Sequence, residues 1–217
     1  MESLIYERLD KICSQIQEAY FSHKVVNIDA GYAGLTADVI NSYIFGHDPG
    51  NLNQEGFNAH VRDSINGILT LCHIMYFFPF LRNCMNALPT DVLRWLSPAA
   101  AALVDQKNDM YQMSLDAIQD PSSAKQGTII SALAEPKMPQ HLRTPERLMN
   151  EGLSLANAGT ETTARSLSLA TYHLLSIDNI RNKLREELKQ LMPTPDVRPT
   201  WNDLEKLPYL VSIDYLI

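Results

Sequence analysis

The sequence has few cysteines and no recognisable metal-binding pattern, and these absences exclude several kinds of site. Its 217 residues include three cysteines, Cys13, Cys72 and Cys84, without the paired spacing of a disulfide framework or a zinc site. We therefore expect three reduced thiols inside the core. The six histidines show no HExxH arrangement, so no metal site is predicted.

Charge and hydropathy exclude two further possibilities. The net charge is −7 and the lysines and arginines form no long run, so nucleic acid is not an expected partner. No apolar stretch is long and uninterrupted enough to cross a bilayer. The acidic beginning, MESLIYERLDKIC, lacks the apolar core of a signal peptide. By itself, the chain is predicted to carry no anchor or signal and to be cytoplasmic or membrane-peripheral.

The rest of the chain is expected to be arranged around one long helix at residues 144–176. Thr144 can cap its start, Pro145 suits the first helical position, and Glu146 favours the positive end of the helix dipole. No later proline interrupts the segment, and one broad stripe contains Leu148, Gly152, Leu155, Gly159, Thr162, Thr163, Ser166 and Ala170. We expect a central rod that is apolar and buried on most sides.

The middle of this helix departs from good helix chemistry. Gly159 is worth about 1 kcal/mol less than alanine inside a helix, and three β-branched threonines surround Glu161. Threonine hydroxyls can bond back to carbonyls one turn earlier and bend the helix. This weak point indicates that another group lies against the backbone. The alternative is that Gly159 only permits close helix packing, while Glu161 and Arg165 form an ordinary exposed ion pair.

These six residues, Ala158-Gly159-Thr160-Glu161-Thr162-Thr163, resemble the oxygen-binding motif of the cytochrome P450 family of haem-thiolate monooxygenases, Ala/Gly-Gly-x-Asp/Glu-Thr-Thr/Ser. The resemblance implies a predominantly α chain, the central part of the P450 fold built round one long buried helix. It implies haem as the cofactor, with Ala158, Gly159 and Thr163 beside it and room for dioxygen over the first two. It also implies catalytic roles for Thr162, as a hydrogen-bond donor to oxygen, and for Glu161, in relaying protons.

Helical spacing predicts four earlier helices, at 1–20, 27–46, 57–81 and 98–119, of which the second is capped by Asn27 or Asp29. Residues 84–97 are expected to be a short connector. The Thr36–Ile40 segment resembles the family's helix before the substrate-pocket roof. The helices around FFPFL…LP…WLSP resemble that roof in fungal microsomal members. The aromatic cluster at 75–81 is also a candidate contact with a membrane surface.

We expect residues 1–217 to form one incomplete domain, because two later features of the family are not found in the sequence. Its parts are helices including the pocket roof at 1–119, a linker with a short helix at 120–143, the central oxygen-binding helix at 144–176, and truncated following helices at 177–217. The family has a Glu-x-x-Arg pair beyond LPYL and a cysteine in a glycine-bearing loop as the iron ligand. None of the three cysteines here has glycine two positions on.

The resemblance therefore implies a truncated monooxygenase-like chain that is inactive alone. The family activity is O2-dependent hydroxylation of a lipophilic small-molecule substrate, with an NADPH-dependent reductase as partner and the endoplasmic reticulum membrane as location. The first alternative is a non-catalytic helical binding or interaction protein derived from such an enzyme. The second is an unrelated helical interaction protein, for which the matching order of elements is coincidence.

Overall fold

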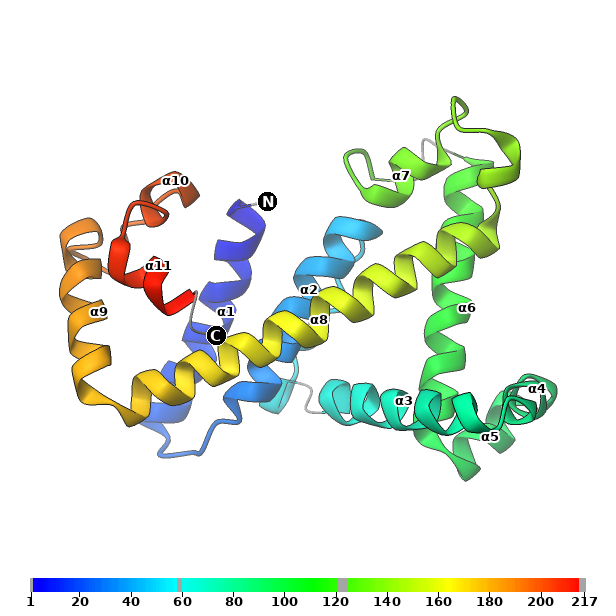
Figure 1. The fold of residues 1–217 in the computed structure, drawn as a ribbon, viewed down its shortest axis with the longest axis horizontal. Helices are drawn as coiled ribbons and strands as arrows, with labels where there is room; N and C mark the ends of the chain where they lie inside the picture. Colours follow the sequence, from blue (N-terminus) through cyan, green and yellow to red (C-terminus); the bar gives the residue numbers. More distant parts are fainter. Residues whose placement is uncertain (1, 58–59, 121–124, 215–217) are drawn as a thin grey trace.

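The computed structural model describes residues 2–57, 60–120 and 125–214, and over these ranges it consists of helices and loops without a strand (Figure 1). The predominantly α prediction is confirmed. In chain order the elements are α1 (Glu2–Phe21), α2 (Ile28–Ile44), η1 (Asn51–Asn53), η2 (Glu55–Phe57), α3 (His60–Phe77), α4 (Phe80–Ala87), α5 (Thr90–Leu96), α6 (Pro98–Gln119), α7 (Ile129–Ala134), η3 (Gln140–Leu142), α8 (Pro145–Ser176), α9 (Asp178–Leu191), α10 (Trp201–Leu204) and α11 (Pro208–Asp214).

Helix α8 crosses the whole molecule in Figure 1, and the other helices are arranged along it. Its 32 residues span roughly 48 Å at about 1.5 Å per residue. The predicted start is confirmed, because the Thr144 hydroxyl oxygen accepts a hydrogen bond from the Arg147 amide at 3.3 Å and Pro145 occupies the first turn. The predicted end at residue 176 is confirmed as well.

The main partner of α8 is α2, which packs along the middle of it. The fully buried residues of α8 recur every four positions, at Leu148, Gly152, Ala156, Thr160 and Ala164. Small side chains in this row allow the two backbones to approach closely. A Cβ added at Gly152 would lie 2.3 Å from the Phe45 ring, at the end of α2. The approach of the two helices therefore depends on glycine at this position.

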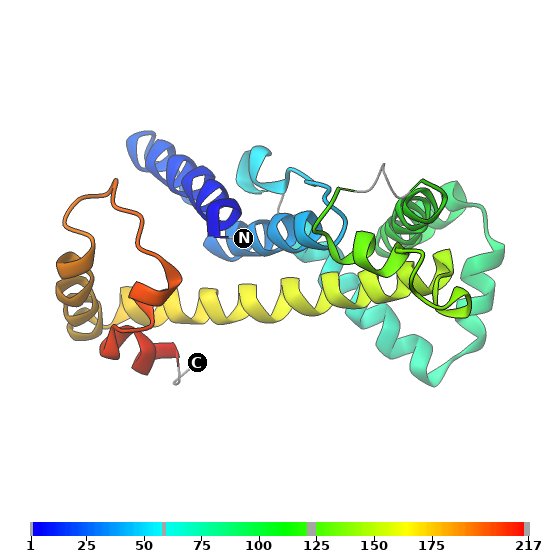
Figure 2. The same cartoon turned by 90° about the horizontal axis from the view of Figure 1, so that it is seen from above.

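The expectation that α8 is buried on most sides is wrong for this chain. Four members of the predicted stripe are exposed: Leu155, Thr162, Thr163 and Ser166. Figure 2 shows the reason, since α1 and α2 both lie on one side of α8 and the middle of the helix is open on the other. Among the described residues, α2 with α6 and α7 covers one long stripe, and the opposite face stays open to solvent.

The segment between α3 and α6 is more helical than expected. The predicted helix 57–81 is shorter, beginning at His60 and ending at Phe77, because Pro79 cannot continue it. The predicted connector at 84–97 is wrong, since this stretch holds the end of α4 and all of α5. Proline correctly marks the breaks, but each piece between two prolines still forms at least one helical turn. The predicted helix at 98–119 matches α6.

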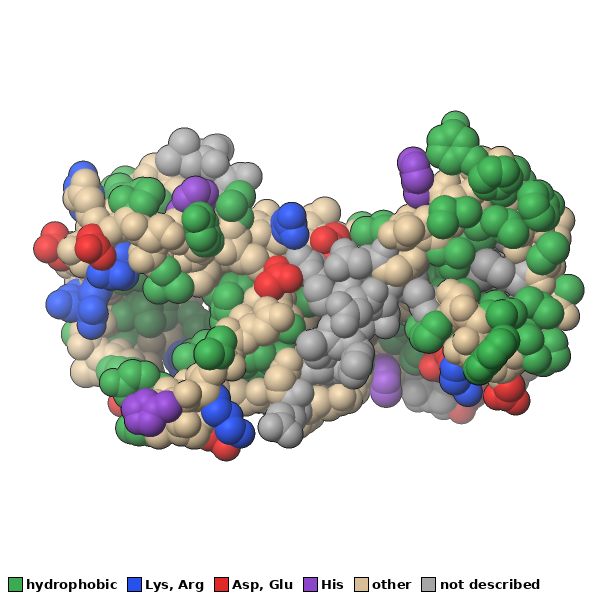
Figure 3. All heavy atoms as spheres, turned by 90° about the horizontal axis from the view of Figure 1, so that it is seen from below, with side chains coloured by type: hydrophobic (Ala, Val, Ile, Leu, Met, Phe, Trp, Pro, Cys, Tyr) green, Lys and Arg blue, Asp and Glu red, His purple; other side chains and the backbone are tan. Residues whose placement is uncertain are grey.

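Hydrophobic side chains gather on the end of the molecule formed by α3 to α6, as Figure 3 shows. The exposed ones at this end include Tyr76, Phe77, Phe78, Phe80, Val92, Trp95 and Leu96. Neighbouring rings meet edge to face in the pairs Tyr76–Phe77 and Phe78–Phe80. In the described ranges, no helix is both long and apolar enough to span a membrane.

The prediction that the cysteines are core thiols is wrong. Cys13 on α1, Cys72 on α3 and Cys84 on α4 are all exposed. Beside two of them a larger apolar residue packs into a core instead, Ile12 next to Cys13 and Leu71 next to Cys72.

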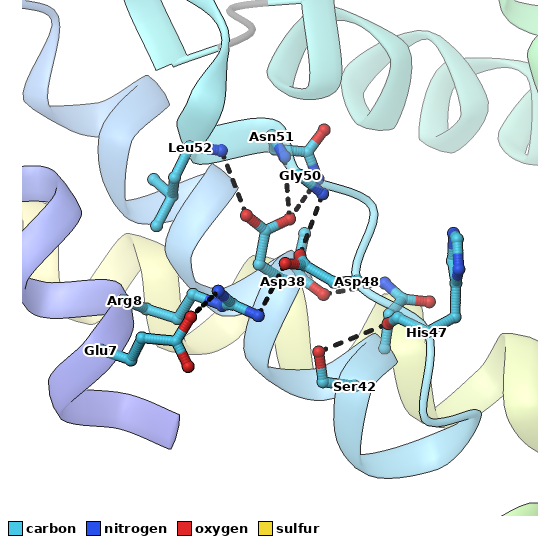
Figure 4. Close-up of polar contacts among 11 residues, drawn as sticks. Glu7, Arg8, Asp38, Ser42, His47, Asp48, Gly50, Asn51 and Leu52 are labelled. Carbon is cyan, nitrogen blue, oxygen red and sulfur yellow. Dashed lines mark hydrogen bonds and ion pairs between the residues drawn. The ribbon is translucent and has the colours of Figure 1, made fainter. Parts of the chain in front are cut away.

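A buried carboxylate fixes the loop that follows α2 (Figure 4). One oxygen of Asp38 accepts hydrogen bonds from the Asn51 amide at 3.1 Å and the Asn51 side chain at 2.8 Å, and the other accepts from the Leu52 amide at 3.1 Å. Burial raises the pKa of Asp38, although these three donors oppose the shift. Buried Arg8 ties α1 to the same loop through Asp48, at 2.7 Å. The loop thus holds α1 and α2 together behind α8.

Candidate functional site

The exposed face of α8 carries a hydroxyl and a carbonyl that are joined to each other. The Thr162 hydroxyl donates to the Ala158 carbonyl oxygen at 2.8 Å, and both residues are exposed. They are one turn apart and therefore share one side of the helix. This is the back-bonding that the threonine-rich sequence predicts.

A second hydroxyl makes the same kind of bond on the opposite side. The Thr160 hydroxyl donates to the Ala156 carbonyl at 2.7 Å, and both residues are buried. Positions 160 and 162 point about 200° apart around a helix. One turn of α8 therefore carries a back-bonded threonine on its α2 side and another on its open side.

Gly159 lies toward α2 and away from the open face. A Cβ added there would be 3.1 Å from Cγ1 and 3.2 Å from Cδ1 of Ile40. The structure thus supports the close-packing interpretation of this glycine. On the open face, the small side chain of the motif is the methyl group of Ala158. The role of Gly159 beside a cofactor stays a prediction.

The other two predicted site residues flank this turn. Glu161 is half-buried and Thr163 is exposed. The structure therefore brings Ala158, Thr162 and Thr163 to the accessible surface, with Glu161 at its edge and Gly159 behind it. The ion pair between Glu161 and Arg165 remains a prediction.

The open face suits one side of a flat apolar cofactor such as haem. Small and hydroxyl-bearing side chains, with Leu155, occupy the middle of α8, and a planar group can approach the backbone there. Ala158, Thr162 and Thr163 therefore fit one side of a haem group, by their small size and their exposure. In the part of the chain that the structure describes, no group of three or more His, Cys, Asp or Glu side chains is placed to hold a metal ion.

Several hydrogen bonds between α2 and α8 were not predicted from the sequence. The hydroxyls of Tyr32 and Thr171 lie 2.8 Å apart, and the Ser168 hydroxyl lies 2.7 Å from a carboxylate oxygen of Asp29. The Thr36 hydroxyl donates to the Thr160 carbonyl at 3.0 Å. The only sequence signal was the Thr36–Ile40 segment, which resembled a family helix without indicating what its side chains contact.

Comparison with known proteins gives the same family over nearly the whole chain. The family model described as "Cytochrome P450" matches residues 1–213. A cytochrome P450 monooxygenase of Trichoderma arundinaceum, TRI4, is 33% identical over 98% of this chain and 42% of its own length. The conidiogenone synthase of Penicillium rubens is 35% identical over 98% of this chain and 43% of its own length.

A solved structure has a similar fold. The crystal structure of a cytochrome P450, CYP102L1, superposes with a TM-score of 0.67 at 17% identity, covering 98% of this chain and 43% of that one. The chain thus spans about two fifths of the length of these three proteins. With a family model matched from residue 1 to residue 213, this chain belongs to the cytochrome P450 family.

Proposed function

We propose that this chain is the central part of an O2-dependent monooxygenase that hydroxylates a lipophilic small molecule. The observation that carries the proposal is the 2.8 Å bond from the Thr162 hydroxyl to the Ala158 carbonyl on the open face of α8. This bond holds a proton donor at the surface, beside a side chain no larger than a methyl group. Such a place can receive a small polar molecule and supply it with a proton.

Haem, when bound, supplies the chemistry of dioxygen activation and substrate oxidation. Ala158 and Thr163, on the open face, would lie against it, while Gly159 lies behind them toward α2. The Thr162 hydroxyl orients and donates a hydrogen bond, and it can turn from the Ala158 carbonyl toward a ligand on the open side. Glu161, half-buried at the edge of the face, accepts protons from solvent and returns them toward Thr162.

The iron ligand would come from a segment beyond this chain, since none of Cys13, Cys72 and Cys84 has glycine two positions on. The chain would then be inactive alone. An NADPH-dependent reductase would supply electrons, and the complete protein would lie at the endoplasmic reticulum membrane. The exposed rings at Tyr76–Phe80 are the candidate contact with that membrane.

The test uses a haem-bearing chimera, in which residues 1–213 of this chain replace the matching segment of the Trichoderma arundinaceum monooxygenase. Product formed and hydrogen peroxide released are measured for each NADPH oxidised. We expect Thr162→Ala to lower product yield and raise peroxide, and Thr162→Ser to restore coupling. Glu161→Gln slows turnover, with about 10²–10⁴-fold as the upper range for acid–base contributions.

Ser166→Ala is the matched control for this experiment. Ser166 is exposed one turn beyond Thr162 on the same side of α8, so its replacement also deletes a hydroxyl from this face. We expect wild-type coupling in this variant. If Thr162→Ala and Glu161→Gln also keep wild-type coupling and rate, both residues are structural and the proposed function is overturned.

A further inference from the structure

The hydroxyl of Thr36 lies within reach of three carbonyl oxygens, of which one belongs to α8. It is 2.9 Å from the Tyr32 oxygen, 3.2 Å from the Ala33 oxygen and 3.0 Å from the Thr160 oxygen. Thr36 is buried, so water does not compete for these bonds. A hydroxyl has one proton to donate. The first two acceptors are in α2 itself, whereas the third joins α2 to the backbone of α8.

The hydrogen bond from Thr36 reaches the same turn of α8 that carries the Thr162 hydroxyl on the open face. Thr160 is buried against α2, and Thr162 is exposed about 200° further round the helix. Ile40, one turn after Thr36 in α2, packs against the backbone of the neighbouring residue, Gly159. The rear of this turn is therefore held at two consecutive residues, by a hydrogen bond at Thr160 and by van der Waals contact at Gly159.

Other hydrogen bonds between the two helices are of a different kind. Tyr32 meets Thr171 and Asp29 meets Ser168 through side chains, which can change rotamer without moving the backbone of α8. Thr36 bonds to a main-chain oxygen. A donor from outside that reaches a helix carbonyl competes with or reinforces the helix's own ladder of hydrogen bonds and so influences the local geometry.

We propose that Thr36 is a positioning residue, which fixes the turn at Ala158–Thr162 from behind and thereby sets where the Thr162 hydroxyl stands on the open face. The role of Thr36 in the reaction rests on the proposed function, whereas its hydrogen bond to the Thr160 carbonyl does not. Catalytic geometry tolerates little displacement, because a shift of about 1 Å can cost 10²-fold in rate. A donor that touches neither cofactor nor substrate then affects how protons reach the reacting molecule.

The first test measures amide hydrogen exchange of α8 by mass spectrometry in the haem-bearing chimera, where the remainder of the fold covers the exposed apolar surface. Thr36→Val replaces the hydroxyl with a methyl group of similar size, and Thr36→Ser keeps the hydroxyl. Tyr32→Phe is the matched control, since it removes an α2–α8 hydroxyl bond at Thr171, away from the motif. We expect Thr36→Val to speed exchange in peptides covering 158–166 by about fivefold. Thr36→Ser restores slow exchange, and Tyr32→Phe affects only peptides near residue 171.

The proposal is overturned if the amides of residues 158–166 exchange equally fast in Thr36→Val and in the wild type. The second test measures coupling in the haem-bearing chimera, where we expect Thr36→Val to release more peroxide at unchanged KM and Thr36→Ser to recover. Uncoupling by Thr162→Ala but not by Thr36→Val would refute the positioning role and leave the function standing. If neither Thr162→Ala nor Glu161→Gln has an effect, the proposed function is refuted, and hydrogen exchange still tests the contact between Thr36 and Thr160.

Discussion

Thr162 and Ala158 are linked hydroxyl to carbonyl at 2.8 Å on the open side of α8, and Thr160 and Ala156 are linked in the same way on the side that faces α2. The motif turn therefore has a fixed rear and an accessible front. This arrangement explains why a weak helical sequence is placed at the centre of the longest helix. The hydroxyls of Thr160 and Thr162 donate hydrogen bonds to carbonyl oxygens of α8 itself. Such bonds weaken the helix locally, and α2 supports the backbone there through Thr36.

The packing of Gly159 against Ile40 leads to a prediction about stability. In the haem-bearing chimera, Gly159→Ala places a methyl group 3.1 Å from Ile40 Cγ1, so the Ile40 side chain must move by a few tenths of an ångström. We expect a loss of about 1–3 kcal/mol from overpacking, offset by up to about 1 kcal/mol from better helix propensity. Urea unfolding of Gly159→Ala, Ile40→Ala and the double variant measures this.

In the double variant the two costs should not add, because Ile40→Ala removes both atoms that crowd the new methyl group. Strictly additive costs would mean that Gly159 does not face Ile40. A stabilising effect of Gly159→Ala in the wild-type background would show that the helices have room to spare at this position.

A second prediction concerns Asp38 and pH. Burial raises the folded-state pKa of this carboxyl above its ordinary value of 3.8, so the folded protein binds the proton more tightly than the unfolded chain does. The stabilisation from this proton is fully present below pH 3.8, and it is lost as pH rises through the raised pKa. Above that pKa the buried charge is a constant cost.

Asp38→Asn removes this titration, so the free energy of unfolding of the wild-type chimera should fall relative to that of Asp38→Asn as pH rises from 4 to 7. The variant also loses one acceptor, the oxygen that serves the Leu52 amide, and this gives an offset that does not change with pH. Urea unfolding at several pH values measures the difference. The raised pKa would be contradicted if the free energy of unfolding of the wild type, minus that of Asp38→Asn, stayed constant or increased between pH 4 and pH 7.

The sequence predicted the ends of the helices better than their faces. Thr144 and Pro145 marked the start of α8, and Pro98 marked the start of α6, because caps and prolines act through their immediate neighbours. The side to which Gly159 turns could not be predicted, since glycine has no side chain to indicate it. Nor could the bond from Thr36 to Thr160, which joins residues 124 positions apart. The burial of α8 was overestimated because the apolar pattern does not specify which partner covers it.

A third prediction follows from the apolar surface that the chain leaves exposed. The most exposed large side chains include Tyr76, Trp95, Tyr172, Leu175 and Trp201. Apolar area stabilises a fold by about 25 cal/mol per Å² only when it is covered, and helix propensity alone stabilises isolated helices marginally. We expect the purified chain to show helical far-ultraviolet dichroism, to bind a hydrophobic dye such as ANS, and to melt over a broad range.

A sharp, cooperative melt of a monomer without dye binding would show that the chain closes its own core. The alternative of a self-standing, non-catalytic binding protein would then be preferred to that of an incomplete enzyme.

The last prediction concerns the metal ligand. The open face of α8 is proposed as the oxygen side of a haem site, with a thiolate supplied from outside these 217 residues. Cys13, Cys72 and Cys84 are exposed on α1, α3 and α4. The decisive measurement is the absorption spectrum of the chain mixed with haem, reduced and exposed to carbon monoxide, alongside the haem-bearing chimera. We expect the red-shifted band of thiolate ligation in the chimera and its absence in the chain alone. A strong red-shifted band from the chain alone would contradict the proposal.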